Sequence, residues 1–140
     1  MTFMTLLDAI RLAPRVYIIG NGGSYANAVH ICNDLLASGI RAYTLDPATL
    51  TASANDFGYE TVFSRWLSVV GESGDVLLAL SGSGKSPNIL AGVAKARELD
   101  MDVWTLYGAV MKQDMQEAEE HQISIGHDLM RALKAARESC

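Results

Sequence analysis

Short apolar runs that alternate with longer helical stretches constrain the fold of this chain most. The runs are too short for helices and are bounded by turn residues, which is typical of buried strands. The sequence predicts strands at Val16–Ile19, Arg41–Leu45, Asp75–Leu80 and Met101–Tyr107. Strands that alternate with helices in this way build βαβ units, in which the strands are parallel and helices cover the sheet.

Helical periodicity places the helices between these strands. The predicted spans are Thr5–Leu12, Tyr25–Ser38, Ala48–Ala54, Glu60–Val70, Pro87–Leu99 and Gln113–Glu138. A turn is expected at Asn55–Gly58, Gly39 is expected just past a helix end, and Ser86 is expected to cap the helix at Pro87. The predicted fold is a three-layer α/β/α sandwich with a parallel, Rossmann-like (flavodoxin-like) sheet of four to five strands. Residues 1–140 are expected to form a single domain.

Charge and composition exclude several classes of function. A net charge of −5 argues against a general nucleic-acid binder, which presents a basic face. The longest apolar runs are far too short to span a bilayer, and the first residues lack a secretion-signal pattern. The cysteines, Cys32 and Cys140, do not suggest a disulfide framework, so a reducing, cytoplasmic compartment is expected.

Two glycine- and serine-rich loops, Gly20–Ser24 and Ser81–Ser86, each follow a predicted strand. In parallel α/β folds, ligands bind at this edge of the sheet. Glycines let the backbone approach a ligand, and hydroxyls and free helix N–H groups suit a phosphate. Either loop alone is also compatible with an ordinary strand-to-helix turn, but two at one edge favour an anion site. The candidate phosphate-binding residues are Gly22, Gly23, Ser24, Ser81, Gly82, Ser83 and Ser86.

The second loop also fits a relaxed Walker A pattern, with Ala79 in place of the first glycine. This alternative predicts a nucleotide hydrolase or kinase. Three observations oppose it: the loop follows the third strand, Ala79 belongs to the strand itself, and Met101–Tyr107 ends without an aspartate for magnesium. We therefore expect no nucleotide cofactor.

Several motifs, in order along the chain, resemble the sugar isomerase (SIS) domain of phosphoheptose isomerases. They are Ile19–Ser24, Ala28–His30, Ala54–Tyr59, Phe63–Arg65, Gly74–Ser86 and Ile125–His127. The resemblance implies that Asn55 and Asp56 lie near the sugar hydroxyls. It also implies that the substrate phosphate contacts Ser24, Ser81, Ser83 and Ser86. Members of this family convert sedoheptulose 7-phosphate to a heptose 7-phosphate by moving a proton between C1 and C2.

His30 and Asp34 are four residues apart on one predicted helix and therefore share a face. The resemblance implies that Asp34 stands where these enzymes carry a glutamate base, and that His127 is the catalytic histidine. A carboxylate and a histidine suit the proton transfers of an aldose–ketose isomerisation. Some members hold zinc, so a zinc site of nitrogen and oxygen ligands is a second expectation. Its candidate ligands are His30, Asp34, His127 and either Glu119 or Glu120.

The resemblance further implies a small phosphorylated sugar as substrate and a homo-oligomer, dimer or tetramer, with sites at subunit interfaces. No nucleic-acid or membrane partner is expected. Relative to these enzymes, the chain is shortened at its N-terminus and before its last helix. The alternative is a catalytically silent SIS module that serves as a sugar-phosphate sensor or as an adaptor for another protein.

Overall fold

The computed structural model describes residues 5–107 and 115–138, and its strands form one parallel sheet. The strands are β1 (Val16–Ile19), β2 (Ala42–Thr44), β3 (Val76–Ser81) and β4 (Asp102–Tyr107). Their order is β2-β1-β3-β4, and each neighbouring pair is parallel. This order is that of flavodoxin-like folds, so the predicted α/β class with a parallel sheet is confirmed.

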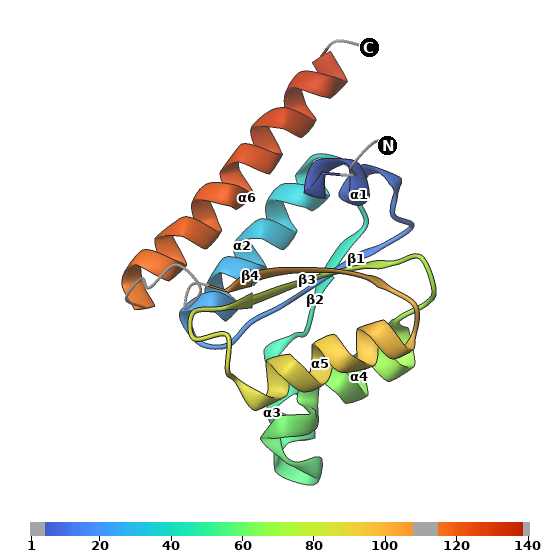
Figure 1. The fold of residues 1–140 in the computed structure, drawn as a ribbon, viewed down its shortest axis with the longest axis vertical. Helices are drawn as coiled ribbons and strands as arrows, with labels where there is room; N and C mark the ends of the chain where they lie inside the picture. The colour runs from blue at the N-terminus through green and yellow to red at the C-terminus, as the bar shows by residue number, and fades with distance from the viewer. Residues whose placement is uncertain (1–4, 108–114, 139–140) are drawn as a thin grey trace.

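Helices cover both faces of the sheet. They are α1 (Leu6–Leu12), α2 (Gly23–Ala37), α3 (Pro47–Phe57), α4 (Val62–Val70), α5 (Pro87–Glu98) and α6 (Met115–Glu138). Figure 1 shows α1, α2 and α6 on one side of the strands and α4 and α5 on the other, which gives the predicted three layers. Within the described residues, no helix has both the length and the apolar character needed to cross a membrane.

The turn predicted at Asn55–Gly58 is wrong in its first residues, because α3 continues to Phe57. The helix begins at Pro47, just before the predicted start at Ala48. The Asp46 carboxylate caps it by accepting the Thr49 N–H at 3.1 Å. Hydrogen bonds from the Thr49 hydroxyl and N–H lower the pKa of Asp46. No residue of α3 is buried, and Figure 1 shows the helix standing away from the sheet.

Alternate residues of the central strands supply two separate cores. Val16 and Ile18 face α1, α2 and α6, whereas Tyr17 and Ile19 face α4 and α5. All four side chains are at most 3% exposed. A strand buried on both faces needs apolar residues at every position, which explains why β1 and β3 read as continuous apolar runs.

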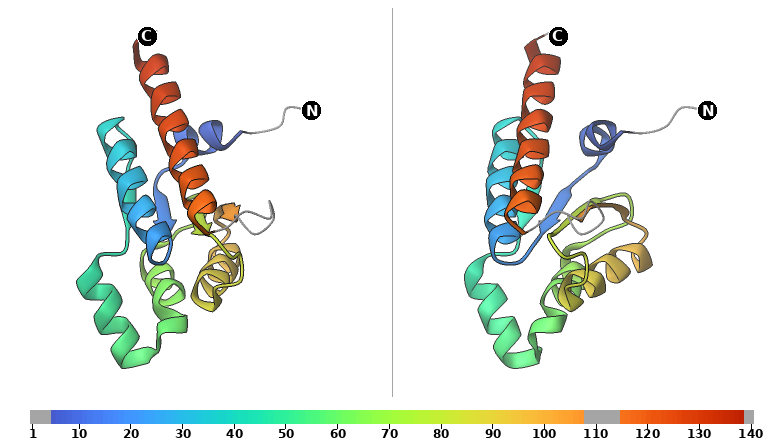
Figure 2. Two further views of the ribbon diagram at one scale, coloured as in Figure 1. Left: turned by 90° about the vertical axis from the view of Figure 1, so that its left-hand side faces the viewer. Right: turned by 60° about the vertical axis from the view of Figure 1, so that its left-hand side comes forward.

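The helices α2 and α6 lie side by side and run in the same direction, as Figures 1 and 2 show. Their close approach depends on Gly126, because a Cβ there would lie 2.6 Å from Cγ1 of Ile31. Ile31 is only 1% exposed and has little room to move. The absence of a side chain at Gly126 therefore sets the spacing between the two helices.

Replacing this glycine is expected to destabilise the fold. Gly126→Ala forces Ile31 or α6 to shift, which costs about 1–3 kcal/mol and outweighs the helix preference of alanine, about 1 kcal/mol. Urea denaturation measures the free energy of unfolding. The matched control is Ser124→Ala on the exposed side of the same helix, which changes stability by no more than about 0.5 kcal/mol. A Gly126→Ala variant as stable as the unmodified chain contradicts this account of the packing.

Candidate functional site

A cavity of about 260 Å³ lies between the loops that follow β1 and β3. These strands are neighbours, and β2 pairs with the opposite edge of β1, so the cavity sits where the direction of the strand order reverses. Ligands of open α/β sheets bind at this place. The lining residues are Asn21, Gly22, Gly23, Ser24, Leu80, Ser81, Gly82, Ser83, Ser86, Met115 and Glu119. The structure thus brings together every residue that the two loops were predicted to contribute.

The first loop turns sharply into α2. Gly22 has φ +55°, a value that glycine adopts without strain, and no side chain caps the helix it precedes. Ser24 is buried, and its hydroxyl donates to Oε1 of Gln122 at 3.1 Å. The same oxygen accepts the Asn27 amide at 3.0 Å. Sequence reasoning missed Gln122, whose only signal is its place on the buried face of α6, four residues before Gly126.

In the second loop, serine oxygens accept hydrogen bonds from the backbone. Oγ of Ser81 accepts the Gly84 N–H at 3.0 Å, and Oγ of Ser83 accepts the Lys85 N–H at 3.1 Å. A hydroxyl oxygen that accepts in this way keeps its own proton for another acceptor. Ser86 occupies the N-cap position of α5 as predicted, but its hydroxyl makes no capping bond and lies 3.5 Å from that of Ser81. The loop therefore presents hydroxyl donors to the cavity.

The surroundings of this loop do not favour nucleotide binding. Lys85 is exposed and does not line the cavity, and Ala79 lies within β3, as expected in the argument against a Walker A loop.

Gly84, with φ +68°, lies beside the ring of Tyr107 at the end of β4. Burial raises the pKa of the Tyr107 phenol, so this group stays neutral.

The first turns of α6 cover the cavity. Met115 packs against Gly82 of the second loop, and the carboxylate of Glu119 packs against Gly23 of the first. Among the described lining residues, Glu119 is the only ionisable one. Glu120, the alternative in the prediction, is exposed and accepts a hydrogen bond from Gln116 at 3.2 Å.

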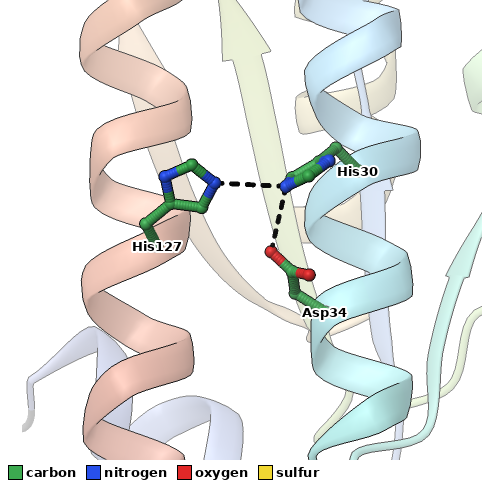
Figure 3. Close-up of side chains that lie close together, drawn as sticks. All are labelled: His30, Asp34 and His127. Carbon is green, nitrogen blue, oxygen red and sulfur yellow. Dashed lines mark hydrogen bonds and ion pairs between the residues drawn. The ribbon is translucent and has the colours of Figure 1, made fainter.

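A second group of polar side chains lies between α2 and α6, further from the loops. Figure 3 shows His30 between its two partners. Its Nε2 atom is 3.2 Å from Nε2 of His127 and 3.2 Å from Oδ2 of Asp34. One ligand atom from each residue lies within 4.8 Å of the others. The structure thus brings together three predicted ligands, and neither Glu119 nor Glu120 belongs to the group.

This group fits a divalent metal ion. The Oδ2 atom of Asp34 is buried and makes no well-directed hydrogen bond, although it lies close to the His30 ring. A buried carboxylate oxygen of this kind is costly unless a cation or donor satisfies it. Two imidazole nitrogens and one carboxylate oxygen match the three protein ligands of a catalytic zinc site with one open position.

The predicted sugar-binding pair, Asn55 and Asp56, lies elsewhere. Both residues are exposed near the C-terminal end of α3, where the Asn55 amide donates to the Asp56 carboxylate at 3.2 Å. Neither residue lines the cavity. Within one chain, the structure does not bring this pair to the loops.

In the comparison with known proteins, one family model matches most of the chain. The model described as SIS domain matches residues 3–108. The chain is 41% identical over 112 residues to the phosphoheptose isomerase of Bradyrhizobium sp. strain BTAi1, a match that covers 74% of this chain and 57% of that protein. The chain spans about half the length of the curated relatives it matches.

Solved structures of phosphoheptose isomerases have the same fold. The structure of GmhA from Neisseria gonorrhoeae matches with a TM-score of 0.81 at 29% identity, covering 93% of this chain and 81% of that one. The Francisella tularensis phosphoheptose isomerase matches with a TM-score of 0.81 at 27% identity, covering 92% and 82%. The described helices and strands are therefore those of the same domain.

The carboxylate in the cavity leads to a prediction about anion affinity. Glu119→Gln keeps the shape of the side chain but removes its charge, so inorganic phosphate is expected to bind about three- to tenfold more tightly. Isothermal titration calorimetry measures this dissociation constant. Glu120→Gln removes an equal charge from the adjacent, exposed position and is the matched control, with little expected change. Equal effects of the two substitutions contradict a specific repulsion by Glu119.

Proposed function

The chain belongs to the SIS domain family, and from this membership we propose that it binds a phosphorylated sugar and isomerises it between ketose and aldose. The proposed substrate is sedoheptulose 7-phosphate or a similar sugar phosphate. Similarity to phosphoheptose isomerases supports this choice. The roles of individual residues given below are part of the same proposal.

One observation carries the proposal: both loops line the same cavity. Ser24 lines it from the first loop, with its hydroxyl proton donated to Gln122, and Ser81, Ser83 and Ser86 line it from the second. The N-terminal ends of α2 and α5, which follow these loops, add positive partial charge. Neutral donors of this density suit a phosphate dianion, which needs many hydrogen bonds but no buried cation.

The His30 group lies at a suitable distance for the reacting end of the sugar. His30 follows Ser24 by six residues on the same helix, so it is about 9 Å further along the α2 axis. A sugar phosphate held by its phosphate in the cavity extends along α2 and α6 toward His30 and His127. One ligand can therefore contact both groups at once.

The proposed chemistry moves a proton from C1 to C2. Asp34 removes the proton from C1 while His127 donates a proton to the C2 oxygen, which gives a neutral enediol. Return of the proton to C2, with loss of the proton from the C1 oxygen, completes the aldose. In the alternative form of this proposal, His30, Asp34 and His127 would instead hold zinc, which would polarise the carbonyl oxygen of the substrate.

We also propose a homo-oligomer, a dimer or a tetramer with sites at subunit interfaces. The helix α3 supports this proposal, because none of its residues is buried within the chain. In an assembly, Asn55 and Asp56 can contact the sugar in a site that they do not line within one chain. A cytoplasmic location is proposed because Cys32 is a free, buried thiol, as is usual in reducing compartments.

Substitution of the proposed base tests the function. Asp34→Asn keeps the size of the side chain but cannot accept the C1 proton, so kcat for sedoheptulose 7-phosphate is expected to fall about 10²- to 10⁴-fold with a smaller change in KM. NMR of the heptose 7-phosphate product measures turnover, with zinc supplied and after chelation. Asp128→Asn is the control, because this exposed carboxylate pairs only with Arg131 among the described ion pairs.

Two outcomes would replace the proposal by another function. Binding of the sugar phosphate without turnover at any zinc load would indicate a silent SIS sensor or adaptor. Magnesium-dependent ATP or GTP binding that Lys85→Ala abolishes would indicate a P-loop nucleotide hydrolase or kinase. The proposed isomerase instead converts the substrate and has little affinity for nucleotides.

A further inference from the structure

Asn88 is a polar residue among the otherwise small or apolar buried residues of α5. It is the second residue of α5, follows Pro87, and is only 2% exposed. The other buried residues of this helix are small or apolar, and the helix packs on α4, β3 and β4. A buried side-chain amide is costly unless its donor and acceptor are both paired. The identity of its partner therefore indicates what Asn88 does.

The partner of Asn88 is Asn21, 67 residues earlier in the chain. The two side chains exchange hydrogen bonds: the Asn21 amide donates to Oδ1 of Asn88 at 2.7 Å, and the Asn88 amide donates to Oδ1 of Asn21 at 2.9 Å. Such a two-bond pair fixes both distance and orientation. It ties the loop after β1 directly to the first turn of the helix after β3.

Asn21 also shapes the turn that presents Ser24. Its backbone carbonyl accepts the Ser24 N–H at 2.9 Å, and the residue lines the cavity. Asn88, by contrast, does not line the cavity. Asn88 can therefore act on a bound phosphate only through Asn21 and through the relative position of the two loops.

A third segment joins this pair. Tyr59 lies in the turn Tyr59–Thr61 between α3 and α4, and its hydroxyl donates to Oδ1 of Asn21 at 2.7 Å. This oxygen thus accepts two hydrogen bonds, one from Tyr59 and one from Asn88. Because α3 buries no residue of its own, the Tyr59 hydrogen bond is a link between this outlying helix and the cavity wall.

We propose that Asn88 is a positioning residue that holds the two phosphate loops in the binding geometry before the ligand arrives. The inference rests on the proposed function, since it assigns Asn88 to the same phosphate site. Preorganisation of this kind lowers the cost of binding, so its loss raises KM and the dissociation constant more than it lowers kcat. Tyr59 contributes in the same direction through the shared oxygen, but less, because it is half-exposed.

Calorimetric titration with inorganic phosphate tests this role at a temperature well below unfolding. Asn88→Leu, of similar size but without donors or acceptors, is expected to raise the dissociation constant about tenfold, and Tyr59→Phe about two- to threefold. With sedoheptulose 7-phosphate, Asn88→Leu raises KM by a similar factor and changes kcat by less than about twofold. Tyr17→Phe is the matched control for Tyr59→Phe. It removes one phenol hydrogen bond, to the Val70 carbonyl, at a position away from the cavity. It is expected to lower the melting temperature without changing phosphate affinity.

A folded Asn88→Leu variant with unchanged phosphate affinity overturns the inference. If Asn88→Leu does not fold, the Tyr59→Phe variant tests the inference instead. An unchanged phosphate affinity of Tyr59→Phe then overturns the inference. Failure of the unmodified chain to bind phosphate rejects the proposed function together with this inference. Normal binding by the unmodified chain and by all variants rejects only the role of Asn88.

Discussion

Parallel pairing of β1 with β3 determines how far apart the two serine- and glycine-rich loops lie. The strands are hydrogen-bonded in register from Val16 with Val76 to Ile19 with Ala79, so their carboxyl ends meet at one edge of the sheet. Both strands are buried on both faces and have little freedom to shift. A cavity shared by two loops follows from this pairing, because each loop alone provides only part of its wall.

The helices α2 and α6 carry a second group of polar side chains beyond this cavity. Both begin at the loops and run in the same direction, with Glu119 beside Gly23 at one end and His127 beside His30 further along. Their spacing depends on Gly126, which lets α6 approach α2 closely enough for the two imidazoles to meet. The pair α2 and α6 therefore positions the Glu119 carboxylate at the cavity and the His–Asp–His group further along.

Much of this architecture can be predicted from the sequence, because it depends on local patterns. Apolar runs predicted the strands, and glycine and serine after two of them predicted the loops that line the cavity. Long-range hydrogen bonds could not be predicted in this way: Asn88 pairs with a residue 67 positions away, and Ser24 with Gln122, 98 positions away. The placement of Glu119 depends on how α6 is rotated against α2, which the helical period alone does not determine.

The central claim is that one phosphate group binds both loops at once. A crystal structure of the chain with sedoheptulose 7-phosphate tests this most directly. We expect the phosphate between Ser24 and the loop Ser81–Ser86, with the sugar carbons extending toward His30 and His127. A phosphate held by one loop only, or bound away from this cavity, would contradict the claim.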